Sequence, residues 1–404
     1  MANTFDFTGK ISPCKETENF KPFETRTFDS GWQKETLKFN VVCGANRHLL
    51  ETAVLLAPTL ENTVIYTTTK GGQNADGTKI KGENIQVKFA DRNKKDIVDS
   101  VANFKKFVVD TELPGRRQAL ENAINKFKSG EITDEQMETL GVKSLSECET
   151  ALEKSNKKKH EYIFEYDFIE CLNKIVSKPE IKDWNWHITG NYTLEYSAKD
   201  DKWYRKFNPQ RVYRAADDAE IKSQGTFNVV FDKEAVDDSD FDETGKMHVN
   251  GFIGQYLGNP YKKVCYSPMM FTIDGNGDDK AKKKALGFKK IFTFPDECDR
   301  EYREISIVCD ILDGAQVVEL SEDMLTDEQK ENIEFGLITI EDIKRELGKP
   351  VYGDKVQDII ITGLARGYSG GAKDTEYTEA DLGKPKSATD SVVVDDIFDE
   401  DDEI

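Results

Sequence analysis

The chain has 404 residues, of which 37% are hydrophobic and 33% are charged, and its formal net charge is −20 with an isoelectric point near 4.8. This length allows two or three domains of ordinary size. A uniformly acidic surface repels phosphate, so the charge excludes nucleic-acid binding unless part of the surface is basic.

The cysteines and histidines form no metal or disulfide pattern. The seven cysteines are an odd number without CxxC spacing, which favours free thiols. The four histidines are far apart and show neither HExxH nor HxH, so we expect no metal and no cofactor. The absence of a long apolar run and of a signal-peptide pattern predicts no membrane segment and a cytoplasmic location.

The first half of the chain combines strand and helix signals. Residues 1–22 are predicted to form an N-terminal arm, and residues 23–271 a β-barrel domain with a helical insertion at about 112–182. Segments rich in β-branched residues predict strands over 35–43, 62–69 and 83–90, with a short helix over 46–56. Within the insertion, Thr133 with Gln136 and Ser144 with Glu147 have the spacing of helix-capping pairs.

Residues 184–271 are dense in strand signals separated by polar turns, which predicts antiparallel hairpins. Residues 272–382 are predicted to form a second, smaller β-rich domain with two helices, and its strands are expected over 289–295, 303–312, 315–320 and 356–365. The predicted fold class is α+β, mainly β, with one or two small antiparallel barrels. The five-stranded oligonucleotide-binding (OB) barrel is the commonest such design, although other small barrels give the same pattern.

Residues 383–404 are predicted to be a linker and a disordered acidic tail. Residues 390–404 contain eight Asp or Glu residues and neither Lys nor Arg, so they bury too little apolar surface to fold alone. The tail is either a solvating segment or an interaction segment that recruits basic partners and competes with DNA. In the second interpretation, the partner-binding residues are Asp395, Asp396, Ile397, Phe398, Asp399, Glu400, Asp401 and Asp402.

A strand at 202–214 carries the strongest candidate site. The surrounding residues 184–214 hold eight aromatic residues and six cations against three acids. A period of two places Trp203, Arg205, Phe207, Arg211 and Tyr213 on one face. Because a buried unpaired guanidinium is costly, we predict that this face is exposed and binds single-stranded nucleic acid. The predicted binding residues are Trp203, Arg205, Lys206, Phe207, Arg211, Tyr213 and Arg214.

Other interpretations of this strand remain open. Cation–π contacts and salt bridges would decorate an ordinary β surface, a bulge at Pro209 would reverse the phase and bury the rings, and the face could also contact a protein. A run of lysines between Lys280 and Lys290 is either a phosphate-contacting loop or a solvated one.

The sequence offers little support for an enzyme. There is no GxSxG motif, and no GK[ST] follows the glycines at Gly370 and Gly371. The segment 274–279 begins like a calcium loop but has Asp279 at its sixth position and Ala285 at its twelfth, where Gly and Glu are needed. We therefore expect a protein without catalytic activity.

The predicted β-barrel core, the aromatic and basic strand KWYRKFNPQRVYR and the acidic tail together resemble the single-stranded-DNA-binding proteins of phage replication systems. The resemblance covers 184–271 and 390–404. In that family the acidic tail carries an apolar residue, often a terminal Phe, whereas here Ile397 and Phe398 lie inside the acidic run.

The resemblance implies sequence-tolerant binding of single-stranded DNA in phage replication or recombination, in the cytoplasm of the infected host cell. It also implies that the tail recruits replication or recombination proteins. Two alternatives are a phage virion or assembly protein and a replication accessory that binds mainly other proteins.

Overall fold

The computed structural model describes residues 3–73, 79–197, 202–257, 263–317, 325–340, 342–343 and 352–382. The molecule mixes helices with a larger content of strands, which confirms the mainly β prediction. The predicted linker and tail, 383–404, lie outside the described residues. No described helix is long and apolar enough to cross a membrane.

Most strands belong to one hydrogen-bonded system. The strands are β1 (Thr4–Pro13), β2 (Phe23–Thr27), β3 (Gln33–Cys43), β4 (Asn46–Leu56), β5 (Val64–Thr68), β6 (Gly72–Gln73), β7 (Lys79–Ile80), β8 (Asn84–Lys88), β9 (Phe107–Asp110), β10 (Lys159–Tyr162), β11 (Asn185–Ser197), β12 (Lys202–Arg214), β13 (Lys222–Phe231), β14 (Val236–Asp237), β15 (Lys246–Leu257), β16 (Lys263–Asp274), β17 (Arg303–Val317), β18 (Tyr352–Leu364) and β19 (Lys373–Asp374).

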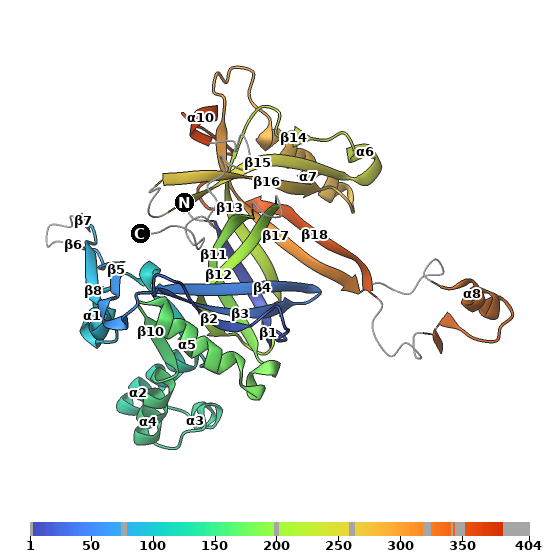
Figure 1. Cartoon of the computed structure of the whole chain (residues 1–404). Helices are drawn as coiled ribbons and strands as arrows, with labels where there is room; N and C mark the ends of the chain where they lie inside the picture. The colour runs from blue at the N-terminus through green and yellow to red at the C-terminus, as the bar shows by residue number, and fades with distance from the viewer. Residues whose placement is uncertain are drawn as a thin grey trace.

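The helices lie between and after these strands. The α-helices are α1 (Lys95–Ser100), α2 (Arg116–Ser129), α3 (Asp134–Leu140), α4 (Leu145–Asn156), α5 (Glu165–Val176), α6 (Phe241–Thr244), α7 (Asp279–Phe292), α8 (Asp327–Glu334) and α10 (Glu379–Leu382). Short 3-10 helices are η1 (Leu60–Asn62), η2 (Phe89–Asp91), η3 (Asn103–Lys105) and η4 (Pro179–Asp183). Figure 1 shows α2, α3 and α4 as a separate group at one end of the molecule.

The strand pairings close two circuits of five strands, here called the first and the second ring. In the first ring the order is β1–β3–β4–β12–β11 and back to β1. In the second ring the order is β13–β15–β16–β18–β17 and back to β13. In each ring one pairing is parallel, β4 with β12 and β16 with β18, and the other four are antiparallel.

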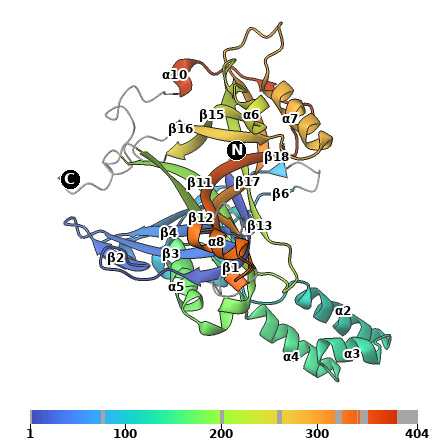
Figure 2. The same cartoon turned by 90° about the vertical axis from the view of Figure 1, so that its right-hand side faces the viewer.

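The two rings also share the position of one helix. In chain order, α5 lies between the third and fourth strands of the first ring, and α7 lies between the third and fourth strands of the second. Helix α5 buries Phe168, Ile169 and Leu172 in the core cluster, and α7 buries Phe288 and Phe292 in the same cluster. The rings are joined directly, because β1 pairs with β13 from Thr4 opposite Thr226 to Thr8 opposite Lys222. Figure 2 shows the strands of both rings meeting in the middle of the molecule.

The prediction that residues 1–22 form an N-terminal arm is wrong for residues 4–13, which form strand β1. Strand β1 lies inside the sheet and pairs with β11, β13 and β3. Its Phe5, Phe7 and Ile11 side chains are buried in the core. The alternation of Phe5, Phe7 and polar residues is typical of a half-buried strand.

Two further predictions of secondary structure are wrong. Residues 46–56, expected to be helical, form strand β4, whose alternate residues are buried. Residues 289–292, expected to begin a strand, end helix α7. Asp278 is the N-cap of this helix, because its side chain accepts a hydrogen bond from the backbone N–H of Ala281. The helix therefore starts well before residue 289 and continues through the apolar residues that had suggested a strand.

The capping pairs predicted at 133–136 and 144–147 are confirmed as the starts of α3 and α4. The hydrogen-bonded sheet continues across the expected boundary at residue 271, because β13 pairs with β17 over eight residue pairs. One core cluster likewise contains side chains from both rings. Neither the sheet nor the core is interrupted at that position.

Candidate nucleic-acid interface

Strand β12 contains a register shift that decides where its side chains point. Thr189 of β11 lies opposite Arg211 and the next residue, Gly190, lies opposite Pro209, so β12 has one extra residue at this point. Proline has no N–H to donate to the neighbouring strand, which favours an irregularity there. The alternation of inward and outward side chains therefore reverses, and Phe207 and Val212 both point into the core.

The prediction that Phe207 is an exposed stacking residue is therefore wrong. Phe207 is 3% exposed and its ring centroid lies 5.0 Å from that of Phe7 and 5.4 Å from those of Phe5 and Tyr192. The bulge at Pro209, one of the alternatives considered from the sequence, is what the structure has. Phe207 stabilises the first ring by filling its interior.

Trp203 and Arg205 share the inward side of β12 with Phe207. Trp203 is half-buried and packs against the main core. The Nη1 atom of Arg205 is buried without a hydrogen-bond partner among the described residues. The nearby Arg205 charge contributes to the low pKa of His48, although burial is the main reason that this pKa falls to about 4. Both residues therefore lie on the side of β12 that faces the core.

Lys206 points outward and bridges neighbouring strands. Its Nζ lies 3.2 Å from a Glu51 carboxylate oxygen and 2.9 Å from one of Glu195. Burial alone would lower the pKa of Lys206, but the two carboxylates outweigh it and raise that pKa above its ordinary value. The ammonium is charged at neutral pH, and its charge is already balanced by acids.

Arg211, Tyr213 and Arg214 lie where β12 runs beside β9. A guanidinium N–H of Arg211 donates to the Asn103 carbonyl oxygen at 2.9 Å. The Tyr213 ring lies 6.3 Å from the His187 ring. The Arg214 guanidinium stacks over Trp184 at 4.1 Å. These three residues are half-buried. They lie at the end of β12 that pairs with β9, whereas Trp203 and Phe207 lie in the other half of the strand.

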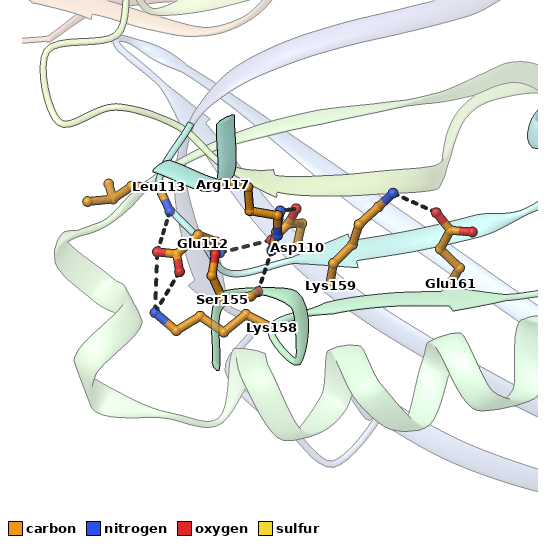
Figure 3. A network of polar contacts seen from close by, with 8 residues as sticks. All are labelled: Asp110, Glu112, Leu113, Arg117, Ser155, Lys158, Lys159 and Glu161. Carbon is orange, nitrogen blue, oxygen red and sulfur yellow. Dashed lines mark hydrogen bonds and ion pairs between the residues drawn. The ribbon is translucent and has the colours of Figure 1, made fainter. Parts of the chain in front are cut away.

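A polar network fixes the insertion to this part of the sheet (Figure 3). Arg117 of α2 pairs with Asp110 of β9 at 2.5 Å and donates to the Ser155 carbonyl oxygen at 2.8 Å. Lys158 lies 3.2 Å from Glu112, which is itself buried. Charge-assisted bonds of this kind hold α2 and α4 against the ends of β9 and β10.

A cavity of about 830 Å³ opens beside this network. It is lined by Arg117, His187, Tyr213, Arg214 and Lys222, together with several acids and alanines. The Asp6 carboxylate lies 2.8 Å from His187 Nε2 and 3.4 Å from Lys222 Nζ. Because the cations around the cavity already have carboxylate partners, it offers little positive charge to a phosphate.

The outer face of the first ring also carries cations, some of them paired with acids, and the sequence did not single it out. On β3, Lys34 and Lys38 alternate with the buried Glu35 and Leu37. On β4, Arg47 and Leu49 are exposed. On β12, which adjoins β4, Tyr204 and Lys206 point outward. We call the outward side chains of β3, β4 and the first half of β12 the basic face.

Aromatic rings and the carboxylates of Glu51 and Glu195 adjoin these cations. Lys38 lies 5.5 Å from the centroid of the Phe20 ring, and 3.6 Å from Glu51. Trp32, in the turn before β3, and Tyr204 are both exposed. Cations spaced by aromatic and apolar side chains on a strand surface provide both phosphate contacts and stacking surfaces. The signal in the sequence was the position of Lys34 and Lys38 on the same face of β3, opposite the buried Glu35 and Leu37.

The corresponding face of the second ring is partly covered by the chain itself. Residues 375–382 pack there, with Leu382 fully buried beside Phe252, Tyr266 and Tyr377. The Thr375 hydroxyl donates to the Tyr302 carbonyl oxygen at 2.9 Å. Residues 375–382 thus occupy the outer surface around Phe252 of β15 and Tyr266 of β16, while Val264 and Met270 of β16 remain exposed.

The described residues contain no cluster of three or more His, Cys, Asp or Glu side chains that could hold a metal ion. No protein-family model matches the chain, and no curated protein matches it. Among solved structures, the chain is similar to a deletion mutant of the single-stranded DNA binding protein from Thermus aquaticus. The match has 6% sequence identity, covers 78% of this chain and 87% of that chain, and has a TM-score of 0.29. A TM-score of this size does not establish a shared fold.

Proposed function

We propose that this protein binds single-stranded DNA without strong sequence preference, through the basic face of the first ring, and that it has no catalytic activity. The observation that carries the proposal is the strand order of the two rings. Each has the order 1–2–3–5–4 with a parallel pairing of strands 3 and 5 and a helix between strands 3 and 4. We infer that each ring is an OB barrel, in which the face of strands 2 and 3 binds oligonucleotides.

In the first ring, strands 2 and 3 are β3 and β4, which carry the basic face. Lys34, Lys38 and Arg47 would contact phosphates, and the exposed Tyr204 and Trp32 rings would stack on bases. A single acid, Glu51, lies among these residues on β4 and is already paired with Lys38 and Lys206. The local charge therefore opposes that of the whole chain, as binding of a polyanion requires.

The context proposed for this activity is DNA replication or recombination of a phage in the cytoplasm of the infected cell. The protein would coat single strands exposed in these processes. The acidic tail, with Ile397 and Phe398 as apolar anchors, would recruit replication or recombination proteins.

A fluorescence-anisotropy titration with labelled oligo-dT at several salt concentrations tests the proposal. The wild type should bind with a salt slope that falls by roughly 0.7 for each phosphate contact that is removed. A triple variant, K34Q/K38Q/R47Q, should therefore lose about two units of slope. The matched control is K126Q/K128Q/K143Q, which removes the same charge from α2 and the start of α4 and should bind like the wild type. A wild-type slope near zero, or equal losses in the two variants, would contradict the proposal.

A further inference from the structure

The hairpin of β5 and β8 packs one apolar face against the rest of the molecule and exposes an aromatic ring on the other face. Ile65 and Val87 lie opposite each other and are buried against Val101 and Ile163. On the other face Tyr66 lies opposite Gln86 and is 73% exposed. An exposed aromatic ring on a strand surface offers a flat face on which a base can stack.

The hairpin is held in place by its neighbours. The backbone N–H of Phe89 donates to the Thr63 carbonyl oxygen at 3.2 Å, so the hairpin is closed at its base. On its other side, the Lys70 N–H donates to the Ser100 carbonyl oxygen at 2.7 Å, and the Ala102 N–H donates to that of Thr68 at 2.8 Å. A ring carried on such a support loses little further conformational entropy when it binds a ligand.

Three exposed lysines lie along the same stretch of chain, Lys88 on β8 opposite Val64 and Lys79 and Lys81 in and after β7. Lys79, Lys81 and Lys88 are exposed, and none of them forms an ion pair within the part of the chain that the structure describes. Among the described residues between 63 and 90, the acid is Glu83. In a protein with a net charge of −20, this surface has the opposite sign.

Two segments connect the hairpin with the first ring. It follows β4, whose Leu55 is exposed, after the short helix η1. The segment after α1 carries Phe104, which is 64% exposed and has Lys105 over its ring, and Asn103 of this segment accepts the hydrogen bond from Arg211 of β12. Figure 1 shows β5 and β8 standing beyond the end of β4.

We propose that the β5–β8 hairpin is a second contact surface for the same single strand of nucleic acid. Tyr66 stacks on a base, and Lys79, Lys81 and Lys88 contact phosphates after the strand leaves the basic face. The inference rests on the proposed function, and it adds a separate site that lengthens the bound segment. A planar ring with spaced ammonium groups suits bases and phosphates better than it suits an acidic protein, which offers no stacking partner.

The test compares two exposed positions with two lengths of oligonucleotide. Tyr66→Ala should weaken binding of an oligo-dT of about 30 nucleotides by roughly 5- to 150-fold, the range expected for one stacked base. It should leave unchanged the binding of one of about 8 nucleotides, which fills a single barrel. Phe335→Ala is the matched control, because Phe335 is 67% exposed near the end of α8, and it should change neither affinity.

Two further measurements separate the possible results. The variant K79Q/K81Q/K88Q should lower the salt slope for the long oligonucleotide by about two units and leave that for the short one unchanged. An oligo-dT carrying 5-iodouracil should cross-link to Tyr66 on irradiation. If the wild type binds no oligonucleotide, the proposed function itself fails. If it binds and Tyr66→Ala behaves like Phe335→Ala, the proposal of a hairpin site is wrong, although the proposed function stands. If the lysine variants bind DNA normally but no longer bind a protein partner, the hairpin surface belongs to that partner.

Discussion

The first and second rings have the same strand order but present different outer faces. On the first ring, the surface of β3 and β4 is open and carries Lys34, Lys38 and Arg47. On the second, residues 375–382 cover β15, with Leu382 buried beside Phe252 and Tyr266. The comparison teaches that two rings with the same strand order can differ in how much of the outer face another part of the chain covers.

The interiors differ as well. Glu35 of the first ring is 6% exposed, with one carboxylate oxygen buried and without a hydrogen-bond partner among the described residues. The described strands of the second ring bury no Asp, Glu, Lys or Arg side chain. The first ring therefore combines a basic exterior with a buried acid, and the second combines a covered exterior with an uncharged interior.

The largest expected effect separates inward from outward residues of β12. Phe207→Ala removes a ring packed against Phe5, Phe7 and Tyr192, and should lower the free energy of unfolding by about 3–5 kcal/mol. Tyr204→Ala, on the outward side of the same strand, should change it by less than about 0.5 kcal/mol. Urea unfolding measures both. If Phe207→Ala left the stability unchanged and weakened DNA binding, the sequence-based hypothesis that Phe207 is exposed would be supported instead.

The cover of the second ring gives the next effect. Leu382→Ala should cost about 2–4 kcal/mol, because the side chain is fully buried in an apolar cluster. It should also speed hydrogen exchange in residues 375–382 and in β15 relative to the first ring. Leu337→Ala, at a Leu that is exposed near α8, is the control and should do neither. Unchanged exchange in β15 would show that the cover adds nothing to the second ring.

The buried acid should make the stability of the first ring depend on pH. Burial, with a smaller contribution from Glu170, raises the pKa of Glu35 to about 7. The folded protein therefore holds a proton that the unfolded chain releases at lower pH, and stability falls as pH rises from about 4.5 to about 7. Glu35→Gln should add up to about 3 kcal/mol at pH 8 and almost nothing at pH 4.

Thermal melts of Glu35→Gln and the wild type across this pH range check the prediction. Glu24→Gln, at an exposed carboxylate of β2, is the matched control and should leave the pH profile unchanged. A constant difference between Glu35→Gln and the wild type at every pH would mean that the amide improves packing and that the charge has no part in the effect.

The smallest expected effect concerns the acidic tail and the open face. Deleting 390–404 removes eight negative charges that would compete for the basic face. The deletion should tighten binding of oligo-dT several-fold at low salt and hardly at all at high salt, since the Debye length shortens as salt is added. Anisotropy titrations of the two proteins at two salt concentrations measure this. Equal affinities at low salt would leave the tail only a solvating or partner-binding role.

The sequence predicted the individual strands better than their arrangement. Alternation of apolar and polar residues located β3, β5 and β8, and capping pairs located α3 and α4. The period of two failed at Pro209 because one extra residue in β12 reversed the pattern beyond it. Helix α7 was missed because the short apolar run was read without its N-cap, Asp278.

The candidate site could be predicted only in part, for a related reason. In the sequence, the cations of β3 and β4 look like ordinary outward residues of two separate strands. Only the strand pairing shows that Lys38 lies opposite Glu51 and that β12 lies beside Leu50. No local pattern states which strands are neighbours, because those contacts join residues far apart in the chain. The richly aromatic segment 184–214 attracted attention, yet several of its rings serve the core.

The position of β1 has a consequence for how the chain is made and folds. Its Phe5 pairs with Gly190 on one side and Gly225 on the other, so both edges of this early strand must find partners far along the chain. Pairings of such long sequence separation close large loops and slow the search for the native arrangement. The pairing of β1 with β3, in which Ile11 lies opposite Val41, can form early in synthesis, but the first ring can close only after β12 has left the ribosome.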